Sequence, residues 1–195
     1  MGERIHLDLS EEVPNYPITL YLTEQGYVYK FRGQQEPNLK PGDKVSKTFE
    51  TDNRSEILVF GTDRICYKVH SKDIEETRAT SLGTYLPALI DNRSVQISSY
   101  SILDEKYKFI LAVYSNNRIS KINLEAFLGN RKFLKNSYNL KQDLVDMVTL
   151  ETDTTITMVT DKVKVDSSTL SLTGSRGATG VYITRKGITQ KVEVA

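Results

Sequence analysis

The feature that most constrains the fold of this chain of 195 residues is a fourfold internal repeat. PITLYLTEQGYVYKF (17–31) aligns without a gap with SEILVFGTDRICYKV (55–69), at an offset of 38 residues. Looser copies are YKFILAVYSNNRISKI (107–122) and TTITMVTDKVKV (154–165). Repeats of roughly 40 to 50 residues are typical of propeller blades, in which each unit packs against the next. The spacing therefore predicts a propeller-like disc of about four blades, with repeats starting near 17, 55, 107 and 154.

Each copy has the sequence form of a β-hairpin, with a run of β-branched and aromatic residues, a polar turn and a second alternating run. The predicted turns, where glycine and asparagine tolerate positive φ, lie at Gln25-Gly26, Asp63-Arg64 and Asn116-Asn117. One further hairpin is predicted at 182–194, to complete the last copy. Helical periodicity is weak, and residues 141–150 suit a strand about as well as a helix. We therefore expect an all-β chain.

Long polar connectors follow the second and third hairpins. Residues 70–81 lead to Gly83 and to an expected strand at 85–90, and residues 123–137 lead to an expected strand at 138–150. A connector of this length, unlike a tight turn, allows a blade to hand its last strand to a neighbour. Such an exchange would tie consecutive blades together and protect sheet edges that a free hairpin leaves open.

The chain is nearly neutral, with 26 Lys and Arg against 25 Asp and Glu, so composition alone does not indicate a nucleic-acid partner. Residues 1–16 hold one arginine and four acidic residues, which leaves a net charge of +4 for residues 17–195. Cys66 has no partner for an internal disulfide and is expected to be a small buried hydrophobe. The chain shows neither a bilayer-length apolar run nor a signal peptide at its start. We expect a cytoplasmic protein without a membrane partner.

Catalytic and metal sites receive little support. His6 and His70 are the only histidines, and they lack the spacing of a metal pair or a neighbouring nucleophile. Glu75 and Glu76 are adjacent in an extended segment, so their carboxylates point apart. Residues 174–180 are glycine-rich but lack the Gly-Lys-Ser/Thr ending of a phosphate loop. We expect no catalytic residue, metal or cofactor in this chain.

The connectors resemble a known family. YKV (67–69), followed by DIEETRA (73–79) and Gly83, resembles the repeat of the C-terminal domain of the gyrase A and topoisomerase IV A subunits. In that family a strand ending in a basic residue runs into an Ile-Pro-Glu-Ala-Ser-Arg-Thr-Ala-Arg-Gly type connector and then an apolar strand. Similar stretches in the later copies are KINLEAF (121–127) with Arg131-Lys132, and GSRGATG (174–180).

The resemblance covers residues 17 to about 190 and implies a β-pinwheel, a propeller-like disc with strands exchanged between blades. It implies binding of double-stranded DNA along a basic outer rim, and bending or wrapping of that DNA. The implied partners are the rest of the A subunit of a type IIA topoisomerase, together with its B (ATPase) subunit, in the bacterial cytoplasm at the nucleoid. The cleavage chemistry of that family lies in a separate domain. Residues 1–16 are then expected to be a linker from the catalytic core or an edge strand, and residues 17–195 the DNA-binding domain.

Two departures from the family pattern are informative. Gyrase carries the box Gln-Arg-Arg-Gly-Gly-Arg-Gly in its first blade, whereas the matching place here reads FRGQQEPN (31–38). The sequence is therefore closer to the topoisomerase IV type. Four copies are also fewer than the five or six blades typical of the family, which suggests a small, open or partial ring.

A lysine recurs at one place in the second strand of each copy, as Lys30, Lys68, Lys121 and Lys164. Such a row suits a phosphate backbone, because each cation that neutralises a phosphate releases condensed counterions. The competing interpretation is a solvated face that keeps strand edges soluble. Further cations in connectors and turns are predicted to contact a bent duplex, and they are Arg78, Arg131, Lys132, Lys135, Arg176, Arg185 and Lys186.

The predicted binding is independent of DNA sequence, because the chain offers no helix to read base edges in a groove. The alternative function is a propeller-type scaffold for protein interactions without a DNA role. A DNA-binding disc should gather its cations on one rim. A scaffold should instead expose an apolar or aromatic patch.

Overall fold

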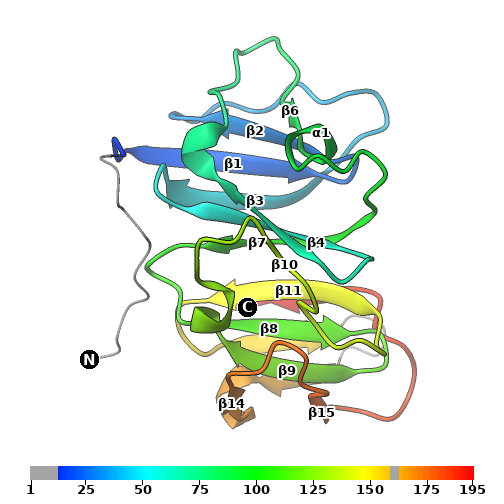
Figure 1. Ribbon diagram of the computed structural model, residues 1–195. Helices are drawn as coiled ribbons and strands as arrows, with labels where there is room; N and C mark the ends of the chain where they lie inside the picture. Colours follow the sequence, from blue (N-terminus) through cyan, green and yellow to red (C-terminus); the bar gives the residue numbers. More distant parts are fainter. Residues whose placement is uncertain (1–12, 159–162) are drawn as a thin grey trace.

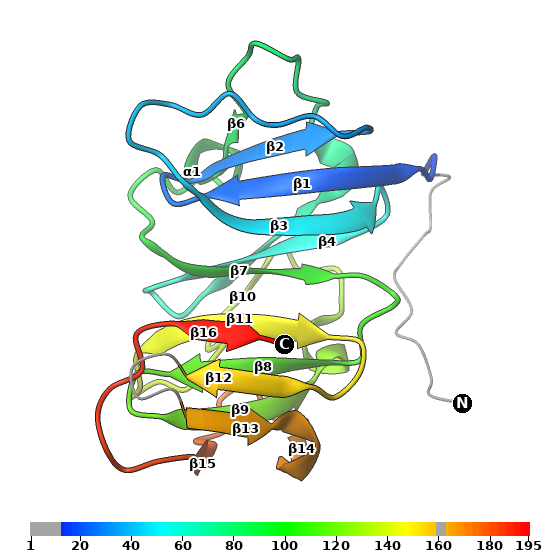
Figure 2. The same cartoon turned by 180° about the vertical axis from the view of Figure 1, so that it is seen from behind.

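The structure is a computed structural model and describes residues 13–158 and 163–195. The chain is almost entirely β, and its strands form four small sheets arranged as the blades of a propeller (Figures 1 and 2). Three blades follow one another down the view of Figure 1, and the fourth lies behind the third, where Figure 2 shows it in front. The predicted all-β fold of four blades is confirmed. Within the described ranges, no helix has the length and hydropathy needed to cross a bilayer.

The blades are named A to D in chain order. Blade A contains β3 (Val45–Asp52), β1 (Pro17–Thr23), β2 (Tyr27–Phe31) and β6 (Thr84–Tyr85). Blade B contains β7 (Ile97–Leu103), β4 (Glu56–Gly61), β5 (Cys66–His70) and β10 (Phe133–Leu134). Blade C contains β11 (Leu144–Leu150), β8 (Phe109–Tyr114), β9 (Arg118–Asn123), β14 (Leu172–Thr173) and β15 (Val181–Tyr182). Blade D contains β16 (Val192–Val194), β12 (Thr155–Met158) and β13 (Val163–Asp166).

The helical segments are short: η1 (Ser71–Asp73), α1 (Leu86–Leu89), η2 (Leu124–Phe127) and η3 (Ser167–Thr169). Each 3₁₀ turn follows the second strand of a hairpin. The central hairpins β1–β2, β4–β5, β8–β9 and β12–β13 are antiparallel, as the repeat predicts. Gly26, Arg64 and Asn117 occupy the first three turns at φ of 94°, 65° and 70°. The fourth turn, and residues 1–12 of the expected linker or edge strand, lie outside the described residues.

Strand exchange links each blade to the next. β6 follows the hairpin of blade B along the chain, yet it pairs with β2 of blade A. In the same way β10 follows the hairpin of blade C and pairs with β5, while β14 and β15 follow the hairpin of blade D and pair with β9. The predicted exchange is confirmed. Each of the first three blades is completed by a strand from the segment that follows its neighbour's hairpin.

Three predicted elements differ from the structure. The expected strand at 85–90 is mostly α1, because Pro87 favours the first turn of a helix and the helix buries Leu86 in the core. The expected strand at 138–150 begins only at Leu144, so the possible helix at 141–150 is a turn followed by the strand Leu144–Leu150. The predicted hairpin at 182–194 is wrong, because β15 pairs with β9 in blade C and β16 pairs with β12 in blade D.

The hydrophobic core lies between consecutive blades. In β4, Ile57 and Val59 pack in a cluster with blade A, whereas Leu58 and Phe60 pack in a cluster with blade C. This alternation is the period-two pattern of a strand buried on both faces. A third cluster joins blade C to blade D, and within the described residues no such cluster joins blade A to blade D. Cys66 is fully buried between blades B and C, and this burial raises the pKa of its thiol.

The inner edge of the disc is formed where β3, β7 and β11 converge. Lys47 of β3 donates hydrogen bonds to the carbonyl oxygens of Tyr100 in β7 (2.7 Å) and Met147 in β11 (2.6 Å). Asp146 lies 2.7 Å from the same ammonium. Because these strands are innermost, the exchanged strands β6, β10, β14 and β15 and their connectors form the outer edge.

Candidate nucleic-acid interface

The first connector lies directly along the outer edge of blade A. The backbone N–H of Thr77 donates to the carbonyl of Lys30 (2.8 Å), and the backbone N–H of Lys30 donates to the hydroxyl of Thr77 (3.0 Å). At Gly83, a Cβ would lie 2.3 Å from the carbonyl oxygen of Val28 in β2. Only glycine permits this approach, which explains why the connector carries a glycine before its strand. The connector therefore covers the outer edge of β2 through hydrogen bonds and a close backbone contact.

Three of the four recurring lysines face the neighbouring blade rather than solvent. Lys30 is 2% exposed, and its Nζ donates to Asn53 Oδ1 (2.7 Å), the Ser71 carbonyl (2.9 Å) and the Ile74 carbonyl (2.9 Å). An ammonium has three N–H donors, so these partners occupy all of them. Because side chains alternate along β2, Lys30 points the same way as Val28, toward blade B. Its ammonium supplies a donor to the Ile74 carbonyl at the end of the η1 turn, and a second donor to the Ser71 carbonyl, which also accepts from the backbone N–H of Ile74.

The next two lysines have the same structural role. Lys68 Nζ donates to the carbonyl of Gly129 (2.8 Å), just after η2, and the side chain is 1% exposed. Lys121 Nζ bonds to Asp153 Oδ1 (2.9 Å) and the carbonyl of Ser167 in η3 (3.3 Å), and the side chain is 10% exposed. The hydrogen bond from Lys121, with a second from Ser167, lowers the pKa of Asp153. We call Lys30, Lys68 and Lys121 the inter-blade lysines.

The expectation that these residues form an exposed row is wrong for the inter-blade lysines. A buried ammonium that is bonded to acceptors inside the protein cannot meet a phosphate without leaving its site. Of the four recurring lysines, only Lys164 is exposed. Its neighbour Val165 packs toward blade C, and because successive side chains of a strand point to opposite faces, Lys164 points to the other face. In the first three copies, the repeated position is therefore a contact between blades.

Most of the predicted connector cations are exposed, namely Arg78, Arg131, Lys132, Lys135, Arg185 and Lys186. The structure brings together Arg131, Lys132 and Lys135, which flank β10 on one connector. Arg176 differs, because its guanidinium donates to the carbonyls of Ala126 (2.7 Å) and Lys135 (3.3 Å). It is half-buried and joins the third connector to the second. Arg176 thus holds the segment that carries three other cations, and its contact with DNA stays a prediction.

Acidic residues interrupt the positive surface. Glu75 and Glu76 are exposed on the same connector as Arg78, and Glu76 pairs with Arg32. Among the residues the structure describes, no three His, Cys, Asp or Glu side chains are grouped as metal ligands would be. The outer edge is thus a set of separate cationic segments.

Two residues at hairpin turns, not predicted as functional, position the loops that cross the turns. Arg64 donates through Nη1 to the carbonyls of Asn139 and Gln142, both at 2.6 Å. Asn117 donates through Nδ2 to the carbonyls of Lys186 (3.2 Å) and Gly187 (2.9 Å). Both occupy the same aligned turn position and both have positive φ. The signal in the sequence was a non-glycine residue at the turn position that requires a left-handed backbone.

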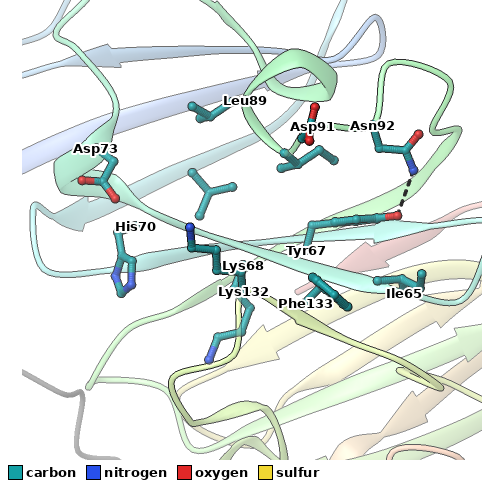
Figure 3. Close-up of a pocket in the computed structure, with 12 residues that line it drawn as sticks. Ile65, Tyr67, Lys68, His70, Asp73, Leu89, Asp91, Asn92, Lys132 and Phe133 are labelled. Atoms are coloured by element: carbon teal, nitrogen blue, oxygen red, sulfur yellow. Dashed lines mark hydrogen bonds between the residues drawn. The ribbon is translucent and has the colours of Figure 1, made fainter.

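An apolar groove of about 660 Å³ opens at the edge of blade B, between β5, β10 and the segment that follows α1 (Figure 3). Leu89 and Phe133 line it and are 42% and 51% exposed. At one end, the Nδ2 of Asn92 donates to the hydroxyl of Tyr67 (2.9 Å). Lys132 lies on its lower side in this view, so the groove is next to one of the exposed cations. An exposed apolar patch is what a scaffold for protein interactions should show.

The chain is similar to known proteins over most of its length, although no family model matches it. The A subunit of DNA topoisomerase 4 from Staphylococcus epidermidis is 27% identical over 191 residues, which is 89% of this chain and 24% of that protein. The same protein from Staphylococcus aureus is 25% identical over 192 residues, or 90% of this chain and 24% of that protein. The chain spans about a quarter of the length of these curated relatives.

Among solved structures, the C-terminal domain of DNA topoisomerase IV superposes with a TM-score of 0.73 at 18% identity, covering 94% of this chain and 62% of that one. The fold is the β-pinwheel found in the C-terminal domain of topoisomerase A subunits. A DNA gyrase A C-terminal domain superposes on this β-pinwheel with a TM-score of 0.61 at 15% identity, covering 91% of this chain and 64% of that one. The resemblance seen in the connectors is confirmed.

Proposed function

We propose that this β-pinwheel binds double-stranded DNA independently of sequence and bends it along its outer edge. The proposal rests on the similarity to the C-terminal domain of DNA topoisomerase IV, which extends over 94% of the chain. The β-pinwheel then acts as the non-catalytic domain of a type IIA topoisomerase that presents DNA to the cleavage core. Its partners are the rest of the A subunit, together with the B (ATPase) subunit, in the bacterial cytoplasm at the nucleoid. Residues 17–195 form this domain.

The exposed cations support binding to the phosphate backbone. Within the described residues, no carboxylate forms an ion pair with the exposed candidates, which are Arg78, Arg131, Lys132, Lys135, Lys164, Arg185 and Lys186. Phosphate contacts position a duplex without reading its sequence. The inter-blade lysines and Arg176 keep the blades and connectors in place, so that these cations are presented on a fixed surface.

The experiment is fluorescence anisotropy of a labelled duplex, titrated with the chain at several salt concentrations. We expect log affinity to fall linearly with log salt. In Arg131→Glu/Lys132→Glu, the slope should become shallower by about 1.8, the value for two lost phosphate contacts. Lys40→Glu/Lys44→Glu is the matched control, because it changes the net charge by the same amount at two exposed lysines away from β10, next to blade A. An equal loss in the control would place the DNA away from β10, and no binding at low salt would refute the function.

A second candidate function is supported by the groove in Figure 3. Its exposed Leu89 and Phe133 could be covered by an apolar segment of a partner protein. If the wild-type chain does not bind DNA at low salt, this scaffold function becomes the better explanation of the fold. Phe133→Ser then tests the scaffold function. The substitution should abolish partner binding but leave the fold intact, because Phe133 is half-exposed.

A further inference from the structure

The loop between β15 and β16 is held in a fixed conformation although it lies on the surface. In Figure 1 it is the orange-to-red segment that projects at the lower right. Asn117, 3% exposed, donates to the carbonyls of Lys186 and Gly187 from the turn between β8 and β9. The hydroxyl of Thr189 donates to Asn117 Oδ1, and its backbone N–H donates to the carbonyl of Ser115 (3.0 Å). The anchored residues therefore fix the position of the exposed ones.

Two arginines lie against one exposed tyrosine at the start of this loop. The guanidinium carbons of Arg118 and Arg185 lie 3.8 Å and 4.6 Å from the centre of the Tyr182 ring. Arg118 is further fixed by donating to the carbonyl of Gly180 (2.7 Å). Lys186 follows directly on the loop. In the part of the chain that the structure describes, no carboxylate pairs with any of these cations, so the cluster is suited to an external anion.

An exposed apolar residue follows these cations along the loop. Ile188 is 60% exposed, the highest value among the exposed large hydrophobic residues of the described chain. It follows Gly187, whose φ of 74° turns the chain sharply after Lys186. Proteins that bend DNA combine cations on the phosphates with an apolar residue against the minor groove, and they offset the bending cost by the extra contacts.

We propose that the loop 183–189 is the part of this β-pinwheel that bends DNA. Arg185 and Lys186 bind neighbouring phosphates, and Ile188 lies against the minor groove between them. Arg118 and Tyr182 hold the guanidinium of Arg185 in place, while Asn117 positions the loop. This inference rests on the proposed DNA binding, and it adds which segment deforms the duplex.

The test combines anisotropy, which reports affinity, with energy transfer between dyes at the two ends of a short duplex, which reports bending. Arg185→Glu/Lys186→Glu should make the salt slope shallower by about 1.8 and abolish the gain in transfer. Ile188→Ser should abolish most of that gain while the Kd changes less than about threefold, since phosphate contacts dominate affinity. Asn117→Gly keeps positive φ accessible but removes the anchor, and should also lower the transfer. Lys40→Glu/Lys44→Glu is the control of equal charge.

The outcomes separate this inference from the proposed function. Wild-type binding with no gain in transfer, or variants of the loop that bend DNA as the wild type does, would overturn the inference and leave DNA binding intact. The same holds if the Lys40→Glu/Lys44→Glu control loses bending equally, because the effect would then follow net charge. Absence of wild-type binding at low salt would overturn both. Circular dichroism of each variant shows whether a loss arises from unfolding.

Discussion

Lys30→Met provides a quantitative test of the inter-blade lysines. The substitution preserves the length of the side chain but removes three hydrogen bonds, of 2.7, 2.9 and 2.9 Å, from a side chain that is 2% exposed. The carbonyl of Ile74 and the Oδ1 of Asn53 lose this donor inside the protein, whereas the carbonyl of Ser71 still accepts from the backbone N–H of Ile74. Each buried acceptor left without a partner costs about 1 to 3 kcal/mol. Methionine offsets part of this loss, because the ammonium no longer has to be desolvated.

The net expectation is a loss of about 2 to 4 kcal/mol in the free energy of unfolding. For a chain of this size, that corresponds to a fall in Tm of roughly 4 to 16 °C. The matched control is Lys164→Met, at the same repeat position but exposed, which should change stability by less than about 0.5 kcal/mol. Urea unfolding followed by circular dichroism measures both variants. Equal stability of Lys30→Met and Lys164→Met would refute the structural role of the inter-blade lysines.

Two further predictions concern the connector and the contact between blades C and D. Gly83→Ala should destabilise the chain by about 1 to 3 kcal/mol, because the added Cβ would lie 2.3 Å from the carbonyl oxygen of Val28. Thermal melts measure this loss, and Gly33→Ala is the control, because a Cβ at Gly33 would meet no atom within 4 Å. Lys121 lowers the pKa of Asp153 below its usual 3.8, so this contact stabilises the fold fully above that pH and is lost as pH falls through the lowered value. Asp153→Asn should therefore be less stable than the wild type at neutral pH and converge with it in acid, and parallel pH profiles would contradict this.

The architecture could be predicted because short sequence patterns that recur along the chain determine it. A gapless repeat, turn residues and long connectors in the sequence indicate blades and their exchanged strands. The hairpin predicted at 182–194 failed for a physical reason. Both halves have strand-forming residues, but a strand pairs with whichever strand edge lies next to it in the fold. β15 lies next to β9 in blade C and β16 next to β12 in blade D, so they do not pair with each other.

The direction of the lysines could not be predicted from alternation alone. Alternation places Lys30 opposite Tyr29, but it does not say whether the face that carries Lys30 meets water or a neighbouring blade. The clue lay in the adjacent strands, since β4 is buried at every position. In a stack of blades covered on both faces, a lysine in the second strand must point into a contact and find acceptors there. The exposed cations could be identified because connectors lie on the surface.

Strand exchange also has a consequence for synthesis on the ribosome. Blade A has β1, β2 and β3 once Asp52 has emerged, but its fourth strand begins only at Thr84, after the whole hairpin of blade B. At translation rates of 5 to 20 residues per second, the edge of β2 therefore waits roughly 2 to 7 s for its partner. Blades B and C wait in turn for strands from the segments that follow the next hairpin. Until blade C is complete, the nascent protein thus carries an unfinished sheet edge, and each of the first three blades closes only after the hairpin of its successor has emerged.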